Sequence, residues 1–111
     1  PDALGFWIET EGVRIYFTGD TSYQSRRMRP VTERETDLLI APINGEFGNM
    51  NERDAAMLAQ QASPRMTIPC HFWTFAHHHG DPGHFQDAMR AIAPDVPFFV
   101  MCQGERITYP R

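Results

Sequence analysis

The sequence lacks any apolar run close to the ~20 residues that cross a bilayer. Its first residues, PDALGFWIET, carry neither a basic n-region nor an apolar h-region. We therefore expect neither membrane insertion nor export. A cluster of basic residues is also missing, because RRMR at 26–29 is too short and the formal net charge of the 111 residues is -4. This balance argues against nucleic acid as the main partner and leaves a small molecule as the expected one.

Cysteine is scarce. The two that are present, Cys70 and Cys102, lie in apolar strand-like runs without CxxC spacing. We expect them to be buried reduced thiols in a cytoplasmic protein. No GxSxG context surrounds Ser22 or Ser25, so a serine nucleophile has little support. The sequence also lacks a Gly-rich phosphate loop of the Walker or dinucleotide type. A chain of this length supports one core, which predicts one small domain or part of one.

Hydrophobic patterning predicts strands and helices in alternation. The strands lie at 5–10, 13–18, 37–42, 66–70, 97–102 and 105–109. The first two and the last two form hairpins, through Glu11-Gly12 and Gln103-Gly104. The helices run from Thr21 or Ser22 to the Pro30 stop, from an N-cap at Asn51 to Ser63-Pro64, and over 85–93. Strands that alternate with helices between two hairpins indicate an α/β sandwich.

Unusual polar residues follow three of the predicted strands. Gly19-Asp20-Thr21 follows one, the loop 44–51 follows a second, and 71–84 follows a third. In layered α/β folds, ligands usually bind at the loops that follow the carboxyl ends of strands. We therefore expect these three loops to converge on one site.

Asp20 and His71 are the first candidates for chemistry. Each alone has a plain structural explanation, because a strand-end aspartate often caps the next helix and a lone histidine is often a hydrogen-bonded structural residue. Together they suit a divalent metal ion, which binds imidazole nitrogen and carboxylate oxygen and lowers the pKa of bound water to about 7. The pair therefore predicts a metal site that generates hydroxide at neutral pH.

The histidine run at 77–79 resembles a metal-binding tract. Neighbouring side chains in an extended segment point to opposite faces, so at most some of the three could share one ion. A solvated loop that lines a cleft explains the run equally well. His84, next to Gly83, fits an exposed position in the first turn of a helix.

Aromatic and amide side chains complete the candidates. Trp73, with Phe72 and Phe75, could wall a pocket or could pack under the loop as a satellite core. Asparagines are ordinary in loops and caps. Asn49 lies between Gly48 and Met50, and it is the asparagine that we expect to face a pocket.

Three segments resemble the second half of a metallo-β-lactamase-fold hydrolase: IYFTGDTSYQ (15–24), DLLIAPINGEFGNMNERDAAMLA (37–59) and IPCHFWTFAHHHGDP (68–82). Within that superfamily they are most similar to the ascorbate 6-phosphate lactonases and their relatives. The likeness extends from about Gly5 to Pro110. It implies the C-terminal half of an αββα sandwich, with a mixed sheet, flanking helices and a metal site at the sheet edge.

The resemblance also implies roles for single residues. Asp20 matches the carboxylate that coordinates and often bridges two metal ions, and His71 matches the last histidine ligand. The residues on loops that would face the substrate are Asn49, Trp73 and His78. The implied cofactor is a divalent metal, manganese or zinc, with two ions in the full-length enzyme.

Two departures from the family pattern stand out. His77 and His79 are additional histidines with no assigned role, and the family's His-x-His-x-Asp-His motif is absent from these 111 residues. Because a catalytic zinc site takes three protein ligands, Asp20 and His71 cannot complete one. We expect residues 1–111 to be a single partial domain of a longer enzyme, with loss of catalysis as the alternative. We expect this chain alone to bind metal weakly and to show no measurable turnover.

The expected function of the parent protein is metal-dependent hydrolysis of a small anionic lactone or ester, with Asp20 orienting the attacking water. An alternative with the same site is a phosphodiesterase like the phospholipase D members of the superfamily, which share the GDT-x-Y element found at 19–23. A third possibility is a non-catalytic fragment or oligomerisation module. Half a sandwich exposes sheet surface, which a homo-oligomer could cover.

Overall fold

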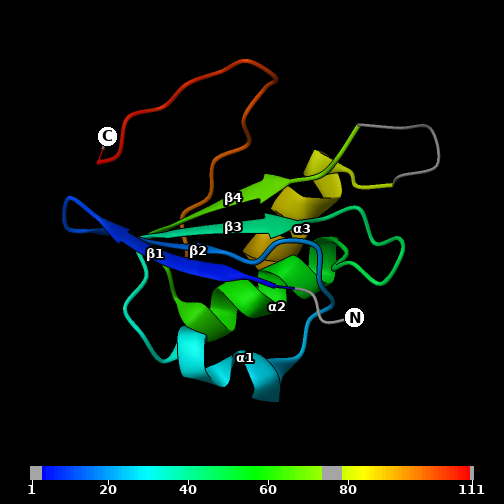
Figure 1. Ribbon diagram of the computed structural model, residues 1–111. Coiled ribbons are helices and arrows are strands. Elements are labelled where there is room, and N and C mark those ends of the chain that lie inside the picture. The colour runs from blue at the N-terminus through cyan, green and yellow to red at the C-terminus, as the bar shows by residue number, and fades with distance from the viewer. Residues whose placement is uncertain (1–3, 74–78, 111) are drawn as a thin grey trace.

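The computed structural model describes residues 4–73 and 79–110. Strands and helices alternate along this part of the chain (Figure 1): β1 Phe6–Thr10, β2 Val13–Phe17, α1 Ser25–Thr32, β3 Leu38–Pro42, α2 Glu52–Ala62, β4 Met66–Cys70 and α3 Pro82–Ile92. The predicted α/β class is confirmed. None of the helices described is long and apolar enough to span a membrane.

The strands form one mixed sheet in the order β1-β2-β3-β4. β1 and β2 form the predicted antiparallel hairpin. Its two-residue turn has left-handed backbone at Glu11 (φ 50°) and Gly12 (φ 77°), which matches the twist of the flanking strands. β2, β3 and β4 run parallel to one another. Their carboxyl ends therefore meet at one edge of the sheet.

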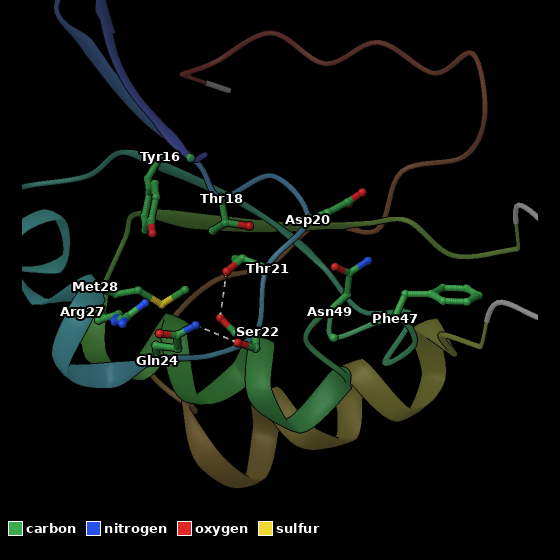
Figure 2. Close-up of a pocket in the computed structure, with 12 residues that line it drawn as sticks. Tyr16, Thr18, Asp20, Thr21, Ser22, Gln24, Arg27, Met28, Phe47 and Asn49 are labelled. Atoms are coloured by element: carbon green, nitrogen blue, oxygen red, sulfur yellow. Dashed lines mark hydrogen bonds between the residues drawn. The ribbon is translucent and has the colours of Figure 1, made fainter. Parts of the chain in front are cut away.

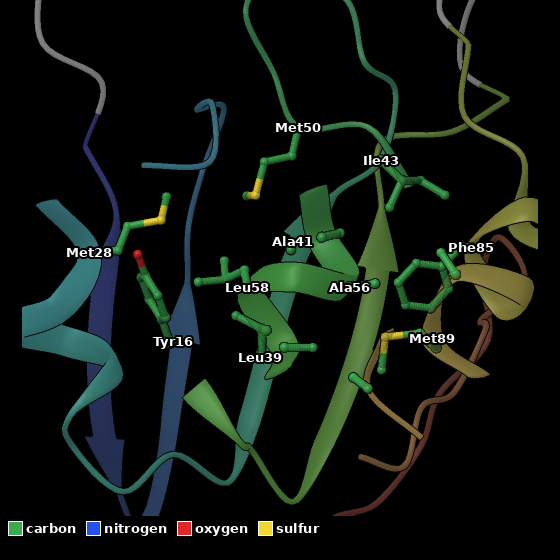
Figure 3. Packing of buried hydrophobic residues seen from close by; sticks show 14 residues of the cluster. Tyr16, Met28, Leu39, Ala41, Ile43, Met50, Ala56, Leu58, Phe85 and Met89 are labelled. Carbon is green, nitrogen blue, oxygen red and sulfur yellow. The ribbon is translucent and has the colours of Figure 1, made fainter. Parts of the chain in front are cut away.

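The helices cover one face of the sheet (Figure 1). Leu39 and Ala41 of β3 point into the core on this face, where they meet Met28 of α1, Leu58 of α2 and Phe85 of α3 (Figure 3). These five side chains are at most 7% exposed. β3 lies between two parallel neighbours and under the helices, which explains the continuous apolar run that predicted it.

The opposite face of the sheet is apolar and only partly covered. Phe6, Ile8 and Phe17 are 55%, 45% and 39% exposed. Phe6 lies opposite Phe17 in the register, and Phe17 lies opposite Ile40, so apolar side chains line up across the strands. We call this surface the open sheet face. An exposed apolar surface of this kind marks a place where another part of a protein packs.

Asn51 caps α2 as predicted. Its side chain accepts a hydrogen bond from the Asp54 peptide N–H (2.9 Å), and the Asp54 carboxylate accepts one from the Asn51 N–H (3.2 Å). This reciprocal pair satisfies two backbone donors at the start of the helix. Ser63, in the left-handed conformation at φ 46°, follows the last helical residue. Both ends of α2 therefore agree with the prediction.

α3 begins earlier than the predicted range 85–93. The Asp81 side chain accepts hydrogen bonds from the peptide N–H groups of Gly83 (2.7 Å) and His84 (3.3 Å), and Pro82 takes the first helical position. A proline is favourable there, since its fixed φ suits a helix and no donor is lost. The helix therefore begins at Pro82, three residues before Phe85, where the apolar pattern predicted its start.

The prediction for α1 is wrong at both ends. The helix begins only after Gln24, which takes the N-cap position in place of Thr21 or Ser22. The Thr21 carbonyl instead accepts a hydrogen bond from the peptide N–H of Met50 (2.9 Å), in the loop before α2. Pro30 lies inside the helix rather than stopping it. A proline there removes one backbone hydrogen bond, and the helix ends soon afterwards, at Thr32.

The predicted hairpin of 97–102 and 105–109 is not formed. The chain instead runs beside the outer edge of β4, where the Thr67 N–H donates to the Pro97 carbonyl and the Phe99 N–H donates to the Thr67 carbonyl, both at 2.9 Å. The apolar pattern that predicted a strand reflects this short parallel pairing with β4. The segment then continues past the sheet edge and passes above the sheet (Figure 1).

Candidate active site

Asp20 lies at the carboxyl edge of the sheet, just beyond β2. The ladder continues through Thr18, whose N–H donates to the Ile40 carbonyl (3.1 Å). The chain then turns at Gly19 (φ 65°), where a β-carbon would lie 2.6 Å from the Leu4 carbonyl oxygen. Because that approach is too close for any side chain, only glycine fits. The turn leaves the Asp20 side chain 68% exposed beyond the sheet.

His71 lies at the same edge, just beyond β4. The Ile43 N–H donates to the carbonyl of Cys70 (3.0 Å) and so holds the residue that precedes His71 against the chain that follows β3. His71 itself is in the left-handed region (φ 60°), which costs ~1–3 kcal/mol for a residue other than glycine and is typical of functional sites. Its Nε2 lies 3.6 Å from Asp20 Oδ1. The structure thus brings the two predicted residues together from the ends of different strands.

The donor atoms of this pair fit part of a metal site. Carboxylate oxygen and imidazole nitrogen are ligands that both zinc and manganese accept. Within residues 4–73 and 79–110, no group of three or more His, Cys, Asp or Glu side chains could hold a metal ion. Since a catalytic zinc takes three protein ligands, Asp20 and His71 fit as two ligands of a larger site. Their role as ligands stays a prediction.

Cys70 lies next to this pair, and its thiol is partly buried. Burial, and secondarily the charge of Asp20, raises the pKa of the Cys70 thiol to about 11. Without a bound ion, the thiol is therefore protonated at neutral pH. Cys70 is only partly buried and Cys102 is exposed, so the expectation of two buried thiols is wrong.

A cavity of about 480 Å³ opens beside Asp20, between the segment that joins β2 to α1 and the loop before α2 (Figure 2). We call it the polar cavity, because much of its lining is polar or charged: Asp20, Thr21, Ser22, Gln24, Arg27 and Asn49. Its floor includes Tyr16 and Met28, which belong to the core. The predicted residue Asn49 therefore shares a cavity with Asp20.

Arg27 supplies the positive charge of the polar cavity. Figure 2 shows Arg27 and Gln24 on the α1 side, with Asp20 and Asn49 on the other. Within the described residues, Arg27 forms no ion pair with an acidic side chain, so its guanidinium is available to an anionic group of a ligand. The sequence alone does not single out Arg27, because RRMR is too short for a nucleic-acid signal and no local pattern marks a residue that lines a cavity.

A second cavity, of about 610 Å³, lies on the side of His71. It forms where residues 101–103 pass the end of β4. We call it the apolar cavity, because most of its lining is apolar, aromatic or sulfur-containing: Ile68, Cys70, Phe72, Trp73, Met101 and Cys102. The Trp73 ring meets the Phe72 ring edge to face, with centroids 5.4 Å apart. The predicted residue Trp73 therefore belongs to a different cavity from Asn49.

Asn44 is a residue that the sequence analysis did not single out. It follows β3 at the same sheet edge and is fully buried, yet neither its Oδ1 nor its Nδ2 has a hydrogen-bond partner among the described residues. A buried amide without a partner costs roughly 1–3 kcal/mol, and ordered water often fills that role. The signal available in the sequence was its position at the end of a buried strand.

The other histidines do not join the Asp20–His71 pair in the described part of the chain. His79 Nε2 lies 3.0 Å from Glu46 Oε1. His84 Nδ1 lies 3.6 Å from Glu52 Oε2, and its side chain is 72% exposed in the first turn of α3, as predicted. The predicted residue His78 lies outside the described residues, as do His77 and Phe75.

Sequence comparisons relate the chain to known proteins. A family model described as "Beta-lactamase superfamily domain" matches residues 2–71. A UPF0173 metal-dependent hydrolase of Archaeoglobus fulgidus is 31% identical over 101 residues, which are 91% of this chain and 43% of that protein. A UPF0173 metal-dependent hydrolase of Deinococcus radiodurans is 40% identical over 82 residues, 74% of this chain and 35% of that protein. The chain thus spans less than half the length of these curated relatives.

Solved structures show the same fold. The novel metallo hydrolase Igni18 from Ignicoccus hospitalis superposes with a TM-score of 0.78 at 26% identity, over 91% of this chain and 43% of that chain. The metallo-β-lactamase fold protein YhfI from Bacillus subtilis has a TM-score of 0.71 at 20% identity, over 87% of this chain and 40% of that chain. The predicted fold class, part of a metallo-β-lactamase-type sandwich, is confirmed.

Proposed function

Because the chain belongs to the family described as the beta-lactamase superfamily domain, we propose that the complete protein is a metal-dependent hydrolase of a small anionic lactone or ester. The observation that carries this proposal is the 3.6 Å approach of His71 Nε2 to Asp20 Oδ1 at the carboxyl edge of the sheet. The names of the relatives in A. fulgidus and D. radiodurans, both metal-dependent hydrolases, support the same class of reaction.

Asp20 and His71 would hold a divalent ion, manganese or zinc, together with ligands from elsewhere in the complete protein. Because the Asp20 carboxylate has two oxygens, one would remain for the attacking water when the other holds the ion. When bound, such an ion polarises a carbonyl group and lowers the pKa of bound water to about 7. The remaining tasks of positioning the substrate and accepting a proton fall to side chains of this chain.

The polar cavity positions the substrate. Arg27 binds its anionic group with the planar guanidinium, which matches a carboxylate or a phosphate. Asn49 donates its amide N–H to the carbonyl oxygen as negative charge develops there. Asp20, which is 68% exposed, orients the attacking water and accepts its proton. The resemblance to ascorbate 6-phosphate lactonases favours a phosphorylated lactone within this class.

A phosphodiesterase is the second candidate, because the Arg27 guanidinium suits a phosphodiester equally well. One contact removes a reason for this second candidate. The Tyr23 hydroxyl, which belongs to the GDT-x-Y element, donates a hydrogen bond to Gln61 Oε1 of α2 and does not line the polar cavity. Tyr23 therefore ties the β2–α1 segment to α2, and the tyrosine of the shared element gives the phosphodiesterase no support from the polar cavity.

The test is an assay of the complete gene product, loaded with manganese or with zinc, on a lactone and ester panel and on a phosphodiester panel. We expect hydrolysis of anionic lactones or esters. Hydrolysis of phosphodiesters alone would exclude the first assignment, and no hydrolysis with either metal would support a non-catalytic module.

Two arginine variants sharpen this assay. We expect Arg27→Gln to raise KM about 10-fold for an anionic substrate, since a charge-assisted hydrogen bond is worth about 1.5 kcal/mol. KM for a neutral substrate of the same ring should stay within about twofold. Arg26→Gln is the matched control, because Arg26 is exposed on the same helix and does not line the polar cavity.

A further inference from the structure

We infer that the apolar cavity beside His71 binds an apolar ring carried by the substrate, on the side of the reacting group opposite its anionic end. The inference rests on the proposed function, because it takes Asp20 and His71 as the reaction centre. It narrows the proposed class of anionic lactones and esters to molecules with one anionic end and one apolar end.

The positions of the two cavities carry the first step. Asp20 lines the polar cavity and His71 lines the apolar cavity. Because Asp20 Oδ1 and His71 Nε2 are 3.6 Å apart, the two cavities adjoin at this pair. A substrate whose reacting carbon lies at the pair therefore extends into both cavities, and each end meets a different surface.

The lining of the apolar cavity carries the second step. Among the described residues that line it, none is Asp, Glu or Arg, and the polar side chains are those of His71 and Gln103. Sugar hydroxyl groups buried there would lose hydrogen bonds to water and find few partners, which costs free energy. A hydrocarbon ring makes no hydrogen bonds to water that it could lose, and burial of its apolar surface is favourable.

Trp73 supplies the third step. Its side chain is 73% exposed, although a large aromatic side chain is normally well buried. Its backbone is in the left-handed region (φ 55°), a costly conformation for a bulky residue, and Phe72 supports its ring edge to face. Met101, which also lines the cavity, has a flexible thioether that adapts to a ligand's shape. A ring bound in this cavity would cover the exposed surface of Trp73.

The size of the apolar cavity agrees with this ligand. Its volume of about 610 Å³ lies within the ~300–1,000 Å³ usual for small-molecule pockets. A single six-membered ring with a short linker fits such a volume with room to spare. The polar cavity, of about 480 Å³, leaves comparable room for the anionic end.

Binding of two simple amides to the complete gene product tests the inference without turnover. N-benzylacetamide carries a ring next to an uncleaved amide, and N-methylacetamide is the matched probe without the ring. We expect N-benzylacetamide to shift the NMR signals of the Trp73 indole N–H and the Met101 methyl group. N-methylacetamide at the same concentration should shift neither. Signals are assigned by their loss in Trp73→Phe and Met101→Leu.

Two variants distinguish binding of the ring in the apolar cavity from non-specific binding to apolar surface elsewhere on the protein. We expect Trp73→Ala to weaken the affinity for N-benzylacetamide about 10-fold, read at the Met101 methyl signal, since the variant loses both the ring–ring contact and the apolar area that the indole buries with the ligand. The exposure of Trp73 makes loss of folding in this variant a small effect. Trp7→Phe is the control, because Trp7 packs under Arg34 away from the cavity, and it should leave the affinity within twofold.

Equal shifts with both amides would overturn the inference. So would ring-dependent shifts confined to Phe6, Ile8 and Phe17 of the open sheet face. The proposed function fails in a different way, through absence of hydrolysis on both substrate panels, and that result would leave the N-benzylacetamide shifts in place. Conversely, loss of the ring-dependent shifts would leave hydrolysis of anionic esters intact.

Discussion

Asp37 anchors the amino end of β3, and its replacement by asparagine is a quantitative test of the packing. Its carboxylate is 7% exposed and accepts hydrogen bonds from the Arg14 peptide N–H (2.8 Å) and from the Tyr109 hydroxyl (3.4 Å). The Arg14 and Arg65 Nε atoms lie 3.4 Å and 3.3 Å from its oxygens. One buried carboxylate thus holds three segments together.

The magnitude follows from these contacts. Arg65 is 70% exposed, so its ion pair adds at most about 1 kcal/mol. The hydrogen bond from the Arg14 N–H to a buried charge is worth about 1.5 to 3 kcal/mol. We therefore expect Asp37→Asn to lower the free energy of unfolding by about 2 to 3 kcal/mol. Glu35→Gln is the matched control, because Glu35 pairs with the same arginine at 2.7 Å but is 79% exposed; its cost should stay below about 0.5 kcal/mol.

The assay is urea unfolding followed by tryptophan fluorescence across pH. The hydrogen bond from the Arg14 N–H, with the nearby guanidinium groups, holds the pKa of Asp37 below its ordinary value. A carboxyl group whose pKa is lower when folded stabilises the protein above the unfolded pKa, and this contribution is lost as the pH falls through the folded pKa. The difference between wild type and Asp37→Asn should therefore be constant above about pH 4 and shrink below it. A cost no larger than that of Glu35→Gln, or a difference that grows toward acid, would refute the reasoning.

Three further predictions concern stability. Asn51→Ala should cost about 1 kcal/mol in urea unfolding, because the Asp54 N–H loses its acceptor; an unchanged midpoint would contradict the cap. Phe85→Ala should cost about 3 to 5 kcal/mol, since the ring is fully buried and meets Phe98 edge to face; a cost below about 1 kcal/mol would contradict this packing. His71→Gly should be about 1 kcal/mol more stable than His71→Ala, because glycine adopts the left-handed conformation without strain; equal stabilities would contradict the φ of 60°.

Local signals predicted the parts of the fold whose contacts are local. The capping box at Asn51 and the turn at Glu11-Gly12 each involve neighbouring residues, so the sequence alone was sufficient to place them. The approach of Asp20 to His71 was predictable for a different reason. Parallel strands end at one sheet edge, so residues just beyond two such strands must lie near one another.

Long-range contacts account for what the sequence analysis missed. Thr21 has the chemistry of an N-cap, but the loop before α2 holds its carbonyl, and α1 therefore starts later. The segment 97–102 has the pattern of a hairpin strand, but its backbone pairs with the edge of β4. Arg27 lines the polar cavity together with residues that are distant in the sequence, such as Gly5 and Asn49. None of these contacts leaves a periodic signal in the sequence.

Metal binding tests the central claim most directly. Calorimetric titration of the complete gene product with Zn²⁺ or Mn²⁺ should give a Kd that rises at least about 10-fold in both Asp20→Asn and His71→Gln. The matched control is His84→Gln, because His84 also has a carboxylate 3.6 Å away, that of Glu52, but lies in the first turn of α3. Its Kd should equal that of the wild type. Unchanged affinity in both Asp20→Asn and His71→Gln would contradict the assignment of this pair as metal ligands.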